Sequence, residues 1–94
     1  MRLIQQQQEL LKSDILALDK NARVFLFGSR VDDEKTGGDI DLLIFSHTLD
    51  KKQLRQVKWH FYDVFGEQKI DILLDSGNLD SPFVRMIFPL SIEL

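Results

Sequence analysis

The chain contains no cysteine among its 94 residues. Without cysteine, neither a disulfide framework nor a thiolate metal site can form, which fits a reducing compartment. The sequence also lacks an apolar run long enough to span a membrane, and its first residues, MRLIQQQQ, do not resemble a signal peptide. We therefore expect a cytoplasmic protein with no membrane partner.

The sequence also has no excess of basic charge. Lysine and arginine number 12 against 15 aspartate and glutamate residues, which gives a net charge of −3. Nonspecific binding to a nucleic-acid backbone depends on clustered lysine and arginine that neutralise phosphates, so we do not expect direct nucleic-acid binding. The hydrophobic content of 44% and the charged content of 29% are ordinary for a globular protein. A length of 94 residues fits a single domain over residues 1–94.

The spacing of apolar residues predicts two long helices and three strands. Apolar positions at helical intervals indicate helices over residues 3–19 and 50–65, and Gly66 is a natural stop for the second. Short apolar runs rich in β-branched and aromatic residues, each bounded by turn residues, indicate strands. The expected strands cover residues 24–27, 39–45 and 68–74.

The C-terminal segment is expected to form a short third helix. Ser81 can cap it and Pro82 can occupy its first position, while Pro89 limits its length. The resulting order is helix, strand, strand, helix, strand, helix. This order predicts an α+β fold with α/β-like character, in which a small mixed sheet has its helices packed mainly on one face.

Two aspartates open the second expected strand, where a strand that only fills a core would not place carboxylates. Alternation along a strand puts Asp39 and Asp41 on one face and Ile40 and Leu42 on the other. Asp71 likewise lies opposite the main apolar stripe of the third strand. If the two strands are neighbours, about 4.8 Å apart, the three carboxylates converge.

Converging carboxylates suit hard divalent cations such as Mg²⁺ or Mn²⁺. Two such ions about 3.5 to 4 Å apart can clamp a phosphoryl or nucleotidyl group during its transfer. The three acids also have ordinary readings: Asp39 and Asp41 could form a solvated strand edge, and Asp71 could be one polar residue of an alternating strand.

A glycine and a serine follow the first expected strand. Gly28 lets the backbone approach a ligand closely, and Ser29 can present an amide and a hydroxyl to an anionic phosphate. A Gly-Ser pair alone marks many turns, so its weight comes from its position at the strand end, shortly before Asp39. Arg30 can either contact phosphate or form a salt bridge with neighbouring acids.

Together, FGSR, the later DIDLLI and the downstream KIDILL resemble the minimal nucleotidyltransferases of the DNA polymerase beta superfamily. The resemblance implies a nucleotidyltransferase fold in which two Mg²⁺ ions assist the transfer of AMP from ATP to a hydroxyl acceptor. It implies that Asp39 and Asp41 bind both metals and that Asp71 completes the metal and catalytic site. Gly28, Ser29 and Arg30 would then form the nucleotide-binding set.

The same resemblance implies a partner. Family members of this size commonly accompany a small helical HEPN-domain protein, and some act as antitoxins that adenylylate it, so we expect such a pair. This resemblance is compatible with either a homo-oligomer or a hetero-oligomer. The alternative is a non-catalytic module of the same fold that binds nucleotide or neutralises its partner by contact. The loop between Ser29 and Asp39 is one residue shorter than in many members.

Overall fold

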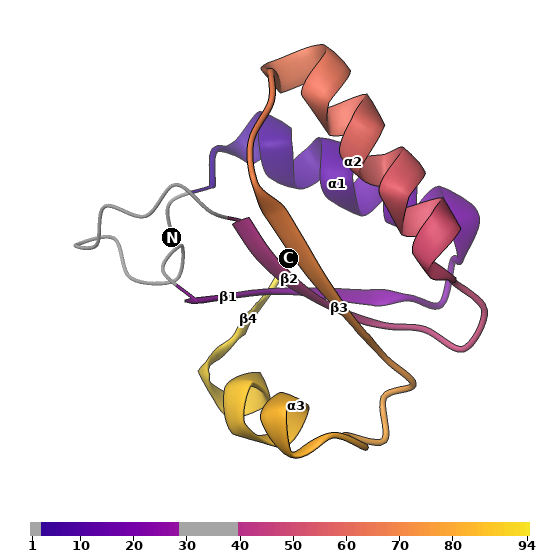
Figure 1. The fold of residues 1–94 in the computed structure, drawn as a ribbon, viewed down its shortest axis with the longest axis vertical. Helices are drawn as coiled ribbons and strands as arrows, with labels where there is room; N and C mark the ends of the chain where they lie inside the picture. The colour runs from indigo at the N-terminus through magenta and orange to yellow at the C-terminus, as the bar shows by residue number, and fades with distance from the viewer. Residues whose placement is uncertain (1–2, 29–39) are drawn as a thin grey trace.

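A four-stranded mixed sheet lies at the centre of the computed structural model, which describes residues 3–28 and 40–94 (Figure 1). All six expected elements are present, and a short fourth strand is added near the C-terminus. In chain order the elements are α1 (Gln5–Leu18), β1 (Arg23–Phe27), β2 (Ile40–Phe45), α2 (Lys51–Phe65), β3 (Ile70–Asp75), α3 (Pro82–Ile87), the 3₁₀ turn η2 (Phe88–Leu90) and β4 (Ile92–Glu93).

The strands run in the spatial order β3-β2-β1-β4. β1 is antiparallel to both β2 and β4, whereas β2 and β3 are parallel. Parallel neighbours need a crossover connection, and α2 supplies it. This combination confirms the expected mixed sheet and makes β3 an edge strand.

The crossover helix α2 is well specified by its local sequence. Asp50 caps its start: the Asp50 carboxylate accepts the backbone N–H of Gln53 at 2.8 Å, and the Gln53 side chain accepts that of Asp50 at 3.0 Å. The helix ends before Gly66, whose φ of 92° suits glycine. In the part of the chain that the structure describes, no helix combines the length and apolar character needed to cross a membrane.

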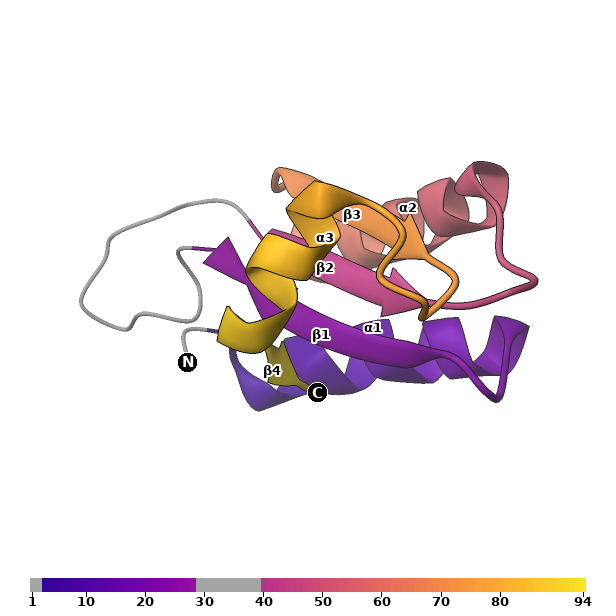
Figure 2. The same ribbon diagram turned by 90° about the horizontal axis from the view of Figure 1, so that it is seen from below.

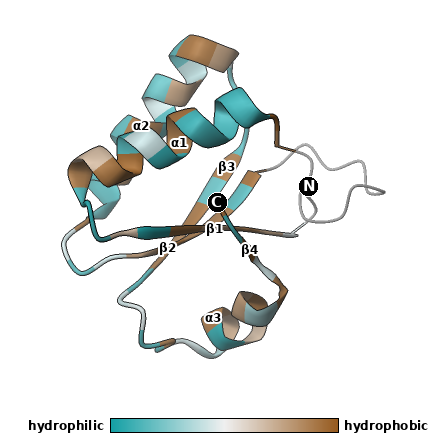
Figure 3. Ribbon diagram, turned by 180° about the vertical axis from the view of Figure 1, so that it is seen from behind, coloured by the Kyte–Doolittle hydropathy of each residue, from teal (hydrophilic) through white to brown (hydrophobic). Residues whose placement is uncertain are grey.

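The two long helices pack side by side on one face of the sheet (Figure 1). Leu11 and Ile15 of α1 and Leu54, Val57 and Phe61 of α2 are buried there. They meet one side-chain row of each long strand, and hydrophobic residues run along β1 and β2 in Figure 3. The row consists of Val24, Leu26, Ile40, Leu42, Ile44 and Ile70.

The short helix α3 covers the opposite face of the sheet, as Figure 2 shows from below. Its buried residues Val84 and Ile87 pack against Phe25, Leu43 and Phe45. Consequently β2 is buried on both faces along most of its length. The expectation of helices mainly on one face is met by α1 and α2, with α3 as the exception.

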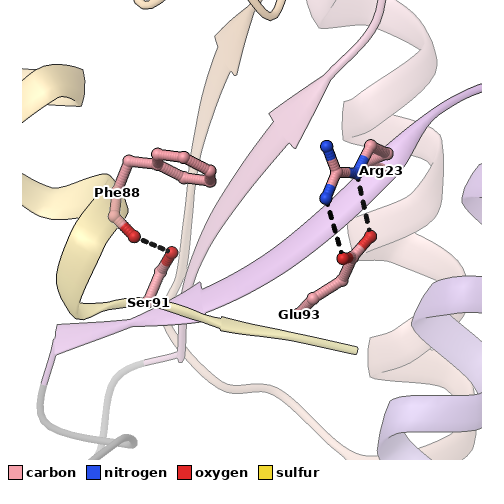
Figure 4. A network of polar contacts seen from close by, with 4 residues as sticks. All are labelled: Arg23, Phe88, Ser91 and Glu93. Carbon is pink, nitrogen blue, oxygen red and sulfur yellow. Dashed lines mark hydrogen bonds and ion pairs between the residues drawn. The ribbon is translucent and has the colours of Figure 1, made fainter.

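The C-terminus returns to the sheet as β4, which the sequence reading did not predict. Ser91 follows η2 and donates its hydroxyl to the carbonyl of Phe88 at 2.6 Å. Glu93 then accepts two hydrogen bonds from Arg23 of β1, at 2.9 and 3.0 Å (Figure 4). These contacts raise the pKa of the Arg23 guanidinium and lower the pKa of the Glu93 carboxyl.

Candidate active site

Two of the predicted acids lie side by side on adjacent strands. Asp41 of β2 and Asp71 of β3 are direct partners in the parallel register, so their strands place them about 4.8 Å apart along the sheet. Asp41 precedes Leu42 of the buried row, and Asp71 precedes Ile72, which packs against the same cluster. Both aspartates therefore lie on the face opposite α1 and α2. Asp41 is half-buried, and the side chain of Asp71 is 53% exposed. This pairing confirms the neighbouring strands that convergence requires.

Gly28 closes the site from the end of β1. Its neighbour Phe27 is the antiparallel partner of Asp41, which brings the two chain segments together. A Cβ atom at position 28 would overlap the Oδ2 atom of Asp41, and the φ of Gly28 is +76°. Only glycine therefore fits both the backbone conformation and the space beside the carboxylate.

Lys69 is a neighbour of the site that the sequence reading missed. Its Nζ lies 3.8 Å from Oδ2 of Asp71, and its carbonyl accepts the N–H of Ile40 at 3.0 Å, which joins the starts of β2 and β3. The ion pair is exposed to water and therefore weak. The available signal was the spacing of two, which puts Lys69 and Asp71 on the same face of a strand.

The remaining predicted residues, Ser29, Arg30 and Asp39, lie outside the described residues. Within residues 3–28 and 40–94, no group of three or more histidine, cysteine or acidic side chains could hold a metal ion. The described part of the site thus contains a pair of carboxylates, Asp41 and Asp71, with Gly28 beside Asp41.

The donor set of this pair fits Mg²⁺. That ion prefers carboxylate oxygens, keeps several waters and is usually held by one or two carboxylates together with substrate phosphates. Asp41 and Asp71 supply two such carboxylates from rigid strands, and Gly28 leaves the space beside one of them free of a side chain. The arrangement is suited to metal-assisted transfer of a phosphoryl or nucleotidyl group.

A cavity of about 380 Å³ lies away from these acids, near the turn that follows β2. Asp19 and Ser46 line it, and the Ser46 hydroxyl donates to Oδ2 of Asp19 at 2.6 Å. That bond, with the backbone N–H of Asn21, lowers the pKa of Asp19. Ser46 also accepts the N–H groups of Thr48 and Leu49. These polar groups bond to one another and organise the turn.

The histidine of α2 is also remote from the carboxylate pair. Nδ1 of His60 lies 2.5 Å from Oδ2 of Asp14, so this contact joins α2 to α1.

The comparison with known protein families agrees with this geometry. Residues 8–88 match the family described as nucleotidyltransferase domain, a span that includes Gly28, Asp41 and Asp71. The chain therefore belongs to the nucleotidyltransferase domain family, and with it to the DNA polymerase beta superfamily. No curated protein matches the chain. The superfamily prediction is confirmed, and a general role in nucleotidyl transfer follows from it.

Proposed function

We propose that the chain is an Mg²⁺-dependent adenylyltransferase that moves AMP from ATP onto a hydroxyl group of a partner protein. The observation that carries this proposal is the register pairing of Asp41 with Asp71 beside Gly28. In the transfer, the acceptor oxygen forms a bond to the α-phosphorus while the bond from that phosphorus to the β-phosphate oxygen breaks. Pyrophosphate leaves, and a carboxylate takes the hydroxyl proton.

Each residue then has a defined task. Asp41 and Asp71, with Asp39 as the third predicted ligand, would hold the metal, which supplies charge stabilisation for the transferring group. Asp71 is the more exposed of the two described acids and can approach the acceptor hydroxyl as the proton-accepting group. Gly28, with the predicted Ser29 and Arg30, would position the phosphates of ATP.

An exposed apolar surface near the acids supports a protein as the acceptor. Phe83, Met86 and Leu90 of α3 and η2 are 48%, 61% and 72% exposed. The ring of Phe83 meets that of Phe27 at 6.5 Å between centroids, and Phe27 is the register partner of Asp41. Exposed apolar groups of this kind are typical of protein interaction sites.

A small helical protein of the HEPN type is the proposed partner, in an antitoxin-like pair. The support is the resemblance of FGSR, DIDLLI and KIDILL to minimal nucleotidyltransferases. The alternative function is a non-catalytic module that binds nucleotide or neutralises the partner by contact. The two differ in whether the carboxylates are needed, because contact alone does not require a metal.

The test is transfer of label from α-labelled ATP, with Mg²⁺, to proteins that co-purify with the chain. Asp41→Asn and Asp71→Asn should each reduce labelling by at least about 100-fold, because each removes a charged metal ligand. Asp63→Asn is the matched control, since it changes an exposed aspartate of α2 in the same way. Chelation of Mg²⁺ with EDTA should also abolish labelling.

Two outcomes would contradict the adenylyltransferase. Labelling that survives both site variants would remove the carboxylates from the mechanism. A stable partner complex without label, from a folded wild-type chain with Mg²⁺, would favour the non-catalytic module.

A further inference from the structure

A second groove lies between α2 and the edge strand β3. It has a volume of about 240 Å³ and is lined by Lys51, Leu54, Arg55 and Lys58 of α2 and by Ile72 of β3. Leu54 is buried, and Ile72 is half-buried. The groove therefore has an apolar floor and three cationic side chains along its helical wall.

The three cations share one stripe of the helix, because positions 51, 55 and 58 are separated by four and three residues. None of the three has an acidic residue three or four positions away in the sequence. In the part of the chain that the structure describes, none of their side chains forms an ion pair or a hydrogen bond.

The positive charges along this groove are unfavourably placed for the isolated chain. Like charges four residues apart on a helix repel, as Lys51 and Arg55 do here. Lys51 also occupies the first turn of α2, where the positive end of the helix dipole disfavours a cation. The chain as a whole carries a net charge of −3, so this concentration of positive charge runs against its overall balance. A bound anion would relieve the repulsion.

We propose that this groove binds the phosphates of a small phosphate-bearing molecule, with inorganic pyrophosphate as its simplest ligand. Arginine offers a fork of donors that matches phosphate oxygens, and two flanking lysines add point charges. A nucleic acid is less suited, since backbone binding uses an extended track of phosphate contacts and the groove provides one short cluster.

The site is independent of the proposed adenylyl transfer. Ile72 lines the groove, whereas its neighbour Asp71 points to the opposite face of β3. The two sites are thus on different faces of the sheet, and binding at the groove requires no divalent cation. A titration in EDTA consequently separates phosphate binding here from any metal-dependent binding at Asp41 and Asp71.

The experiment titrates the ¹⁵N-labelled chain with pyrophosphate in EDTA and follows amide shifts by NMR and affinity by calorimetry. The largest shifts should map to residues 51–58 and to Ile72. Arg55→Gln should weaken binding about tenfold, because a charged donor is lost. Lys52→Gln, the control, removes one charge from the same helical turn without touching the groove and should leave affinity within about twofold.

Two triple variants, each of which removes three positive charges, compare the groove with the rest of the surface. Changing Lys51, Arg55 and Lys58 together to glutamine should abolish pyrophosphate binding, whereas changing the exposed Lys12, Lys20 and Lys52 should not. The circular dichroism melting curve of each triple variant establishes that it is folded, and Arg55→Gln alone decides the question if a triple variant is not.

A parallel titration with ATP in EDTA identifies the source of the phosphates. Tighter binding than pyrophosphate at the same amides would point to a nucleotide, and equal or weaker binding to a free inorganic phosphate. The proposal is overturned by no binding at about ten millimolar pyrophosphate, where even a weak site would fill. Equal losses in the groove and control variants, or preferential binding of a single-stranded oligonucleotide along residues 51–58, would overturn it too.

Discussion

The carboxylate of Asp41 occupies the space that any side chain at position 28 would need. Gly28 also has a φ of +76°, in the region that disfavours residues with a Cβ. These are separate effects: the backbone conformation affects folding, whereas the overlap with Asp41 affects the site itself. Gly66 also has a positive φ, but a Cβ there would meet no neighbouring atom, so it shows the backbone effect without the overlap.

We predict that Gly28→Ala reduces both stability and nucleotidyl transfer, whereas Gly66→Ala reduces stability alone. Each change imposes a positive φ on alanine, which should cost about 1 to 3 kcal/mol of unfolding free energy. Only the methyl group at position 28 displaces the Asp41 carboxylate, since a Cβ at Gly66 meets nothing within 4 Å. Chemical denaturation and label transfer on the two variants measure the two effects. Full transfer activity in folded Gly28→Ala would contradict the placement of Asp41 in the site.

The Asp19–Ser46 hydrogen bond gives a pH-dependent contribution to stability. It lowers the pKa of Asp19 below the ordinary value of 3.8, so the folded state favours the charged carboxylate. This stabilisation is present above that value and is lost as the pH falls through the lowered folded-state pKa. We predict that Ser46→Ala is less stable than wild type at pH 7 and that the difference narrows below about pH 3.8. Urea unfolding from pH 7 to pH 2 tests this, and a difference that widens in acid would contradict it.

The sequence predicted which face of each strand carries Asp41 and Asp71, because side-chain alternation fixes that locally. The sequence did not predict the register that makes the two residues direct partners. Register between β2 and β3 depends on how both strands and the crossover helix pack in the core, which no local pattern specifies. Lys69 was missed for a different reason, because a spacing of two on one strand is too common a local pattern to mark a site residue. Its contact with Asp71 follows from the strand geometry at the start of β3 and not from a recognisable motif.

At the scale of elements, local capping residues mark where α2 and α3 begin. Ser81 accepts the N–H of Val84 at the start of α3, and Pro82 occupies the first turn, as the sequence predicted. By contrast, β4 has only two residues, too few for a periodic pattern. It pairs with β1 through an antiparallel backbone register, and the Arg23–Glu93 pair, whose members are 70 residues apart in the chain, also joins the two strands.

The capping box of α2 should contribute measurably to stability. We predict that Asp50→Ala lowers the free energy of unfolding by about 1 kcal/mol, because the backbone N–H of Gln53 loses its acceptor. Asp63→Ala changes an exposed aspartate inside the same helix and should have an effect within about 0.5 kcal/mol. Urea denaturation of both variants gives the comparison, and equal losses would show that the cap does not stabilise α2.

The whole molecule is a sheet with a hydrophobic cluster on each face. The larger cluster joins α1 and α2 to the sheet, and the smaller one joins α3 through an aromatic group. In that group the rings of Phe25 and Phe45 are 4.9 Å apart, and Phe88 lies 5.2 Å from Phe25. The face that carries Asp41 and Asp71 is therefore supported from behind by the larger core, while α3 and its exposed apolar residues lie on the same side of the sheet.

The larger cluster should dominate global stability. We predict that Phe61→Ala, at a fully buried ring, costs about 3 to 5 kcal/mol of unfolding free energy, a large share of what a small domain has. Phe83→Ala removes the same group from a ring that is 48% exposed and should cost about 1 kcal/mol or less. Thermal and urea unfolding measure both, and a larger loss for Phe83→Ala would contradict this distribution of the core.

The most direct test of the account locates a divalent cation on the chain. Mn²⁺ can replace Mg²⁺ at oxygen ligands, and its paramagnetism broadens NMR signals of nearby amides. Titration of the ¹⁵N-labelled chain should first broaden the amides of Gly28, Asp41 and Asp71, and the Asp41→Asn, Asp71→Asn double variant should lose this effect. Broadening centred elsewhere, or retained in the folded double variant, would contradict the assignment of these carboxylates as the transfer site.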